Sequence, residues 1–160
     1  MSFDIFDATK DNPRRFRRGR SRLAAIGASM QTQMNAILLL VEDEALLSME
    51  IQDALTDGGF EVMLAKDGAE AFKLLENHGH ELRGLVTDIN LGNGPKGWDV
   101  ARRARELMPD LPIVYMSGES GSEWTSLGVP KSVFVAKPFA PAQIVTAVST
   151  LINEAGPIKS

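Results

Sequence analysis

The sequence contains no cysteine and only two histidines. Without cysteine there are no disulfide bonds, thiolate metal ligands or cysteine nucleophiles, and the composition suits a cytoplasmic protein. Long apolar runs are also absent. The densest run, residues 36–41, has the length of a strand, whereas a membrane-spanning helix needs about 20 apolar residues. We therefore expect a cytoplasmic protein that does not enter a membrane.

The 160 residues are enough for one domain with a full core and too few for two of ordinary size. The net charge of −4 is unevenly distributed, because residues 1–35 carry seven Lys and Arg against three Asp and Glu. We divide the chain into a basic N-terminal extension (1–35), an acidic domain (36–155) and a short tail (156–160). An acidic domain repels nucleic acid and favours cations or basic partners.

The extension shows no sustained periodicity, and its arginines crowd residues 14–22. We expect it to be disordered, and Met34, directly before the first predicted strand, is a candidate true start of the protein. Two alternatives stay open: a basic arm that contacts nucleic acid or an anionic surface, and an export signal. Gly27 and Ser29 weaken the export interpretation, because they interrupt the apolar stretch that follows the arginines.

From residue 36 onward, strand-like and helix-like segments alternate, which is typical of an α/β fold with a parallel sheet. Residues 37–41 form an unbroken apolar run, as expected for a strand buried on both faces. Asp67 is a candidate N-cap, and Pro141 suits a first helical position. The predicted strands are 37–41, 60–65, a third strand centred on 85–87, 113–116 and 132–136. The predicted helices are 44–57, 67–78, 97–108 and the segment from 141 onward.

The segment 118–128 fits this alternation poorly. It contains three glycines and three serines, which have low helix propensity. Tertiary contacts would have to stabilise a helix here, so we expect a short or mobile fourth helix.

Polar residues follow the apolar runs at the points where the strands end. Glu42 and Asp43 follow the first strand, Asp88 ends the third, Ser117 the fourth and Lys137 the fifth. The carboxyl ends of parallel strands meet at one edge of the sheet, where ligands bind in such folds. We therefore expect these five side chains to lie close together, although a single acid at a strand end is usually only solvated.

Three carboxylates in one pocket repel one another and need a cation or a proton. Lys137 supplies one positive charge, and oxygen-only ligands favour Mg²⁺ for the remainder. A metal flanked by a lysine and a hydroxyl neutralises a phosphoryl group in transfer, and an aspartate there can be the nucleophile. The residues thus predict a site for Mg²⁺ and phosphoryl transfer, but not a signalling role.

Four segments, in order, resemble the signature segments of bacterial response-regulator receiver domains. They are LLLVEDE (38–44), LVTDINL (85–91), VYMSGE (114–119) and VAKPF (135–139). The resemblance covers about residues 36–153, and four linked motifs are far more specific than one. It implies a doubly wound, flavodoxin-like fold with five parallel strands in the order 2-1-3-4-5, for which a receiver is a standard example.

The resemblance also implies a role for each site residue. Asp88 would be the phosphoacceptor, receiving phosphate from a histidine kinase or histidine phosphotransfer protein. Asp43, Asp88 and the backbone carbonyl of Asn90 would bind Mg²⁺, with Glu42 acting through water. Lys137 would pair with the phosphoryl oxygens.

Further roles concern the switch that phosphorylation sets. Ser117 would donate its hydroxyl to the phosphoryl group, and Phe134 would be the aromatic switch residue. Asn90 and Glu119 occupy positions that tune phosphoryl lifetime in the family. Lys137–Pro138 would be a cis peptide bond.

The sequence departs from the family pattern in two places. The loop LGNGPKG (91–97) has its proline later, and its glycine one residue later, than many receivers. The stretch from Ser117 to Lys137 is also shorter than usual, and Gly118 replaces a common alanine. These departures leave the core chemistry intact but weaken the expectation of a rigid fourth helix, and with it of a fixed partner surface.

We expect a stand-alone receiver, similar to chemotaxis regulators, without a DNA-binding or enzymatic output domain. It would act on a downstream protein through the face formed by helix 4, strand 5 and helix 5. Three other functions remain open: an unphosphorylated protein adaptor, a Mg²⁺-dependent phosphatase with an aspartyl nucleophile, and a flavin binder. The kinase, the pathway, the output partner and the oligomeric state cannot be read from the sequence.

Simpler interpretations exist for individual residues. Lys137 could be an ordinary surface lysine, and Phe134 an ordinary core residue. His78 and His80 are expected to be solvated at the end of a helix. Trp98 and Trp124 fit either a half-buried position in the core or a partner surface.

Overall fold

The computed structural model describes residues 35–119 and 121–156. The expectations for the extension (1–35) and for the tail (156–160) lie outside the described residues, except at Asn35 and Gly156. The described chain forms one five-stranded sheet with all strands parallel, in the order β2-β1-β3-β4-β5, as predicted. The strands are β1 (Ile37–Val41), β2 (Glu61–Ala65), β3 (Leu82–Asp88), β4 (Ile113–Ser117) and β5 (Ser132–Ala136).

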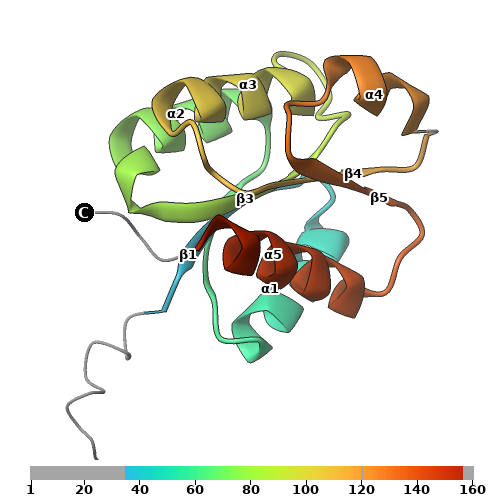
Figure 1. Ribbon diagram of the computed structural model, residues 1–160. Helices are drawn as coiled ribbons and strands as arrows, with labels where there is room; N and C mark the ends of the chain where they lie inside the picture. Colours follow the sequence, from blue (N-terminus) through green and yellow to red (C-terminus); the bar gives the residue numbers. More distant parts are fainter. Residues whose placement is uncertain (1–34, 120, 157–160) are drawn as a thin grey trace, which may run out of the picture. The chain divides into compact units, whose positions relative to one another are not determined.

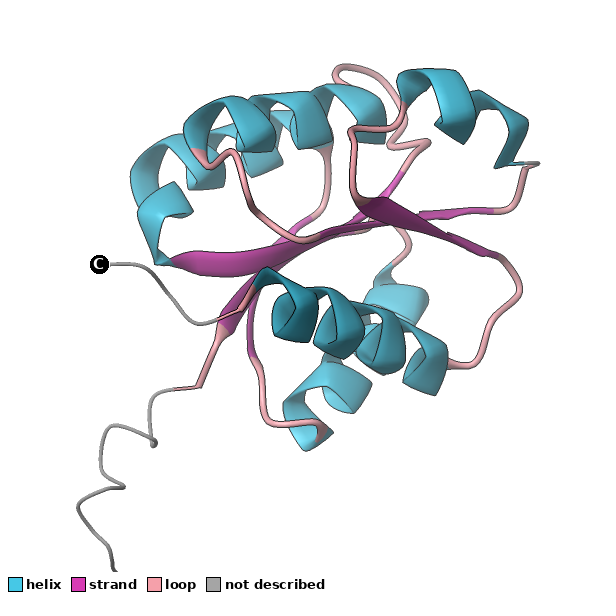
Figure 2. Ribbon diagram, in the orientation of Figure 1, coloured by secondary structure: helices cyan, strands magenta, loops and turns pink. Residues whose placement is uncertain are grey.

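Helices cover both faces of this sheet (Figures 1 and 2). Two of them, α1 and α5, lie on one face, and α2, α3 and α4 lie on the other (Figure 1). The helices are α1 (Ala45–Asp57), α2 (Gly68–His78), α3 (Gly97–Leu107), α4 (Trp124–Leu127) and α5 (Pro141–Ala155), with 3₁₀ turns η2 (Gly79–Glu81) and η3 (Gly121–Glu123). No helix in this part of the chain is long and apolar enough to cross a membrane.

The central strands are apolar because both of their faces are buried. Along β1, Leu39 and Val41 join the core on the α2–α3 side, and Leu38 and Leu40 join the core on the α1–α5 side. All four side chains are fully buried. The unbroken apolar run seen in the sequence therefore serves two cores at once.

The helix boundaries follow local signals. The side chain of Asp67 accepts a hydrogen bond from the backbone N–H of Glu70 at 2.8 Å, so Asp67 caps α2 as predicted. Gly59 ends the turn after α1 with a φ of 97°, a conformation that favours glycine. β3 contains the predicted centre, residues 85–87, and extends back from it through the polar Arg83 and the small Gly84 to Leu82.

The fourth helix is short, as predicted, and its mobility stays a prediction. It comprises only Trp124–Leu127, preceded by η3. The indole N–H of Trp124 donates to the Ser132 hydroxyl oxygen at 2.9 Å, and its ring centroid lies 6.3 Å from that of Phe134. These contacts with β5 stabilise a segment whose own helix propensity is low.

Candidate functional site

The site lies at the carboxyl edge of the sheet, where the strand ends present polar side chains. Glu42 and Asp43 directly follow β1, Asp88 ends β3, Ser117 ends β4 and Lys137 directly follows β5. The backbone of Lys137 is fixed against β4, since its N–H donates to the carbonyl oxygen of Ser117 at 2.8 Å. The topology of the parallel sheet thus places these five residues at one edge.

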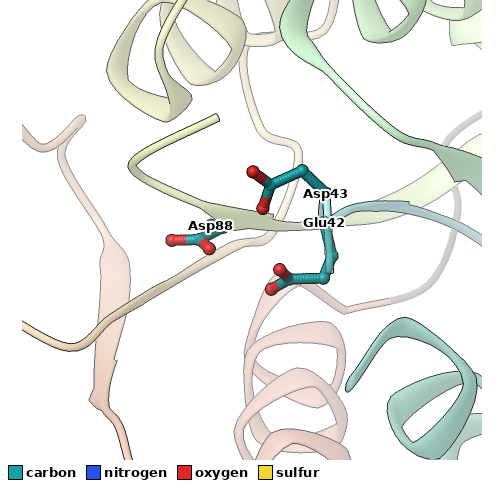
Figure 3. Close-up of side chains that lie close together, drawn as sticks. All are labelled: Glu42, Asp43 and Asp88. Carbon is teal, nitrogen blue, oxygen red and sulfur yellow. The ribbon is translucent and has the colours of Figure 1, made fainter. Parts of the chain in front are cut away.

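Three carboxylates converge at this edge. Oxygens of Glu42, Asp43 and Asp88 lie within 4.8 Å of one another, and Figure 3 shows the three side chains extending into one region from the ends of β1 and β3. Glu42 is only 3% exposed and Asp88 6%, whereas Asp43 is exposed. Two buried acids and one exposed acid therefore share a small volume that opens to solvent at Asp43.

Lys137 is the cation of this cluster. Its Nζ donates to Asp88 Oδ2 at 2.9 Å and to Glu42 Oε1 at 3.5 Å. Burial alone would lower the pKa of Lys137, but the hydrogen bond to Asp88 and the charge of Glu42 together raise this pKa above its ordinary value. The ammonium group is therefore firmly charged and orients one oxygen of Asp88.

The pKa of Glu42 reflects its burial above all, and the charge of its neighbours to a lesser extent. Burial raises the pKa of Glu42 to about 7, although the backbone N–H of Glu44 donates to Glu42 Oε2 at 3.0 Å and opposes the shift. The nearby charge of Asp88 raises the pKa further. One ammonium group does not balance three carboxylates, so the donor set fits a hard divalent cation with oxygen ligands, such as Mg²⁺.

Asn90, Ser117 and Glu119 lie beside the cluster and are linked to one another. The backbone N–H of Asn90 donates to Asp88 Oδ1 at 3.3 Å, and that of Glu119 donates to Ser117 Oγ at 3.1 Å. The side-chain amide of Asn90 donates to Glu119 Oε2 at 3.4 Å. A cavity of about 220 Å³ lies here, with Trp98 and Lys96 also in its lining. The strand-end residues and the residues two positions further on thus form one continuous site.

Phe134 lies outside the acidic cluster. It is half-buried in β5, pairs with Tyr115 of β4 in the sheet register, and contacts the ring of Trp124. A Cβ added to Gly121 would lie 3.0 Å from the Phe134 ring, so the backbone of η3 packs closely on it. Phe134 therefore connects β5 with the segment that follows Ser117.

Two residues that support Asp88 were not identified from the sequence. The hydroxyl of Thr87 donates to the carbonyl oxygen of Asp88 at 2.8 Å. A Cβ on Gly97 would overlap that same carbonyl oxygen, so only glycine fits at the start of α3. The position of Gly97 after a loop rich in glycine was the available signal.

Comparison with known proteins adds an independent finding. Residues 38–149 match the family described as the response regulator receiver domain. The chain belongs to this family. Response regulator receiver domains act in two-component phosphorelay signalling, where they are phosphoacceptor switches rather than classical enzymes and interact with histidine kinases.

Two similar solved chains have the length of a receiver, whereas a similar curated regulator is longer. The crystal structure of a response regulator receiver protein from Sinorhizobium medicae is 45% identical with a TM-score of 0.73, covering 76% of this chain and 97% of that one. A CheY-like receiver from Methanospirillum hungatei is 20% identical with a TM-score of 0.68, covering 76% of this chain and 97% of that one, and shares the fold. The transcriptional regulatory protein CusR of Escherichia coli K12 is 30% identical over 118 residues, covering 72% of this chain and 51% of CusR. The chain thus spans about half the length of this curated regulator.

Proposed function

We propose that this receiver accepts a phosphoryl group on Asp88 from a histidine kinase or histidine phosphotransfer protein, in a reaction that requires Mg²⁺. The observation that carries the proposal is the placement of Asp88 against Lys137 and the two acids of the β1 end. Asp88 Oδ2 lies 2.9 Å from the Lys137 ammonium nitrogen, and its carboxylate shares the cluster with Glu42 and Asp43.

In the proposed reaction, a carboxylate oxygen of Asp88 attacks the phosphorus of the donor. A phosphorus–oxygen bond to Asp88 forms, the bond from phosphorus to the donor group breaks, and the donor group leaves with the bonding electron pair. Lys137 pairs with a phosphoryl oxygen, and Ser117 donates its hydroxyl to another. Both groups stabilise charge on the phosphoryl group as it is transferred.

The metal fits the residues at this edge. Asp43, Asp88 and the backbone carbonyl of Asn90 would bind Mg²⁺ directly, and Glu42 would act through a water molecule. The bound cation would neutralise the charge of the acids and of the phosphoryl oxygens. Its charge would offset the repulsion from Asp88, which adds to the effect of burial in raising the pKa of Glu42.

Phosphorylation would then set a two-state switch. It adds roughly one to two negative charges at Asp88. Ser117 moves to meet the phosphoryl group, Phe134 fills the space that it leaves, and the face formed by α4, β5 and α5 changes shape. A downstream protein that distinguishes the two shapes of this face receives the signal. Asn90 and Glu119, which flank the site, set the lifetime of the phosphoryl group.

The test is phosphorylation by a small acyl phosphate in the presence of Mg²⁺. Intact mass should show one added phosphate on the wild type and none on Asp88→Asn. The matched control is Asp53→Asn, because Asp53 is an exposed aspartate of α1 and should leave labelling unchanged. Equal labelling of the Asp88→Asn variant would show that another residue is the acceptor. Absence of labelling in the wild type would favour a constitutive protein adaptor. Turnover of an external phosphate ester would favour a phosphatase.

A further inference from the structure

The loop between β3 and α3 carries Asn90 but has little to hold its middle in place. Gly92 and Gly94 adopt positive φ angles of 77° and 95°, and a Cβ added at either would meet no atom within 4 Å. These residues lie in open space without side chains. Leu91, which follows Asn90, is 2% exposed and packs in the core on the α2–α3 side, so the start of the loop is anchored and the path of the exposed glycines depends on contacts further along the loop.

The two ends of the loop are joined beside β3. The backbone N–H of Gly97 donates to the carbonyl oxygen of Ile89 at 2.8 Å, which closes the base of the loop. The absence of a side chain at Gly97 lets α3 start directly against the backbone of Asp88. This contact restrains the ends of the loop but not the direction in which its middle points.

A second contact comes from α2. Gly68 is the first residue of α2 and is buried, and a Cβ there would overlap the carbonyl oxygen of Pro95 and lie 2.8 Å from its Cβ. The ring of Pro95 fixes its own φ, so this end of the loop is stiff where it meets the helix. Gly68 and Pro95 thus form a backbone contact that no larger residue at position 68 permits.

The start of α2 is itself held in place. The Asp67 side chain caps the helix, and the backbone N–H of Lys66 donates to Glu70 Oε1 at 2.8 Å. The preceding residue, Ala65, accepts a hydrogen bond from the backbone N–H of Glu42 at 3.1 Å. The chain therefore links the acidic end of β1, through the start of α2, to the loop that follows Asp88.

We propose that Gly68 is a positioning residue for the metal site. It lets Pro95 rest against α2 and so, together with the buried Leu91, sets the place of the Asn90 carbonyl relative to the acids at the ends of β1 and β3. This inference rests on the proposed function. It also explains the late proline of the loop, since a proline at position 95 lies where α2 begins.

The test is a calorimetric titration of the purified full chain with MgCl₂ alone. Gly68→Ala should bind Mg²⁺ at least about tenfold more weakly than the wild type, the usual loss when a group that orients a metal ligand is changed. The matched control is Gly58→Ala, whose Cβ would lie 3.0 Å from Val145 on the α1–α5 side. It also adds one methyl group against a neighbour, and it should bind Mg²⁺ as the wild type does.

A second variant covers the case in which Gly68→Ala does not fold. Pro95→Gly removes the rigid partner without adding a clash, and it should also weaken Mg²⁺ binding while unfolding in EDTA with a midpoint near that of the wild type. Wild-type affinity in both variants, or in the one that folds, overturns the role of Gly68. A wild type that does not bind Mg²⁺ overturns the proposed metal site as well, so the two failures are distinct.

Discussion

Trp124 donates its indole N–H to the hydroxyl oxygen of Ser132 at 2.9 Å. The Ser132 hydroxyl donates in turn to the carbonyl oxygen of Val129 at 2.6 Å, and the Val129 N–H donates to the hydroxyl oxygen of Tyr115 at 3.1 Å. This chain of hydrogen bonds links α4 to β5 and β4. It anchors a helix of four residues, which is too short to be stable by itself.

Ser132→Ala should destabilise the protein by about 1–3 kcal/mol, because the Trp124 N–H and the Val129 carbonyl both lose a partner. The measurement is urea unfolding monitored by circular dichroism. Ser126→Ala is the control, since the Ser126 hydroxyl makes one exposed bond of 3.3 Å to the carbonyl oxygen of Glu123 and its loss should cost less than about 0.5 kcal/mol. Equal effects of the two substitutions would contradict the role of Ser132.

Arg105→Lys should cost about 2 kcal/mol of folding free energy. The guanidinium donates to the carbonyl oxygens of Leu111 at 2.8 Å, Pro130 at 2.6 Å and Lys131 at 3.2 Å, and a single ammonium group cannot span all three. Arg102→Lys, which changes only an exposed ion pair with Asp99, should cost less than about 1 kcal/mol. The prediction fails if the unfolding midpoints of the two variants coincide.

Gly97→Ala should destabilise the fold by about 1–3 kcal/mol, because the new methyl group must displace the backbone of Asp88. Gly118→Ala is the matched substitution on the other side of the site. A Cβ there meets nothing within 4 Å, so the change should be neutral or stabilise by up to about 1 kcal/mol. Thermal unfolding of the two variants checks this difference, and a stable Gly97→Ala would contradict the close approach.

At alkaline pH the wild type should lose stability more steeply than the Tyr115→Phe variant. Burial raises the pKa of Tyr115 above its ordinary value of 10.0, although the Val129 N–H opposes the shift. The unfolded chain therefore loses the phenol proton at a lower pH than the folded chain, and the folded state loses stability as the pH rises above about 10. Because Tyr115 is the single tyrosine, tyrosinate absorbance follows its ionisation directly. A midpoint at or below 10 in the folded protein would contradict the prediction.

The sequence predicted the fold well because the signals for it are local. Apolar runs such as residues 37–41 mark the buried strands, and Asp67 and Pro141 mark helix starts. The cis peptide bond at Lys137–Pro138, implied by the family resemblance, is present. The polar residues at the strand ends were found because parallel topology converts sequence position into place in the sheet.

The sequence did not predict the contacts that support the site, because these join residues distant in the chain. The sequence around Gly68 does not indicate that Pro95 lies against this glycine. The sequence around Arg105 does not indicate that this arginine donates to the carbonyl oxygens of Pro130 and Lys131, directly before β5. Trp98 was expected to be half-buried or at a partner surface. It is 5% exposed, because its ring packs 4.8 Å from that of Tyr115. The weak helix propensity of 118–128 correctly indicated a short helix but not the Trp124 side chain that holds it.

The two tryptophans occupy different parts of the proposed switch. Trp98 is buried at the cavity that Asn90 and Ser117 line, whereas Trp124 is half-buried beside Phe134. Indole emission depends on its surroundings, so the protein carries two natural fluorophores, one beside the chemistry and one beside the responding face. With either tryptophan replaced by phenylalanine, the other becomes a single reporter, and the order in time of the two events can be followed without an attached dye.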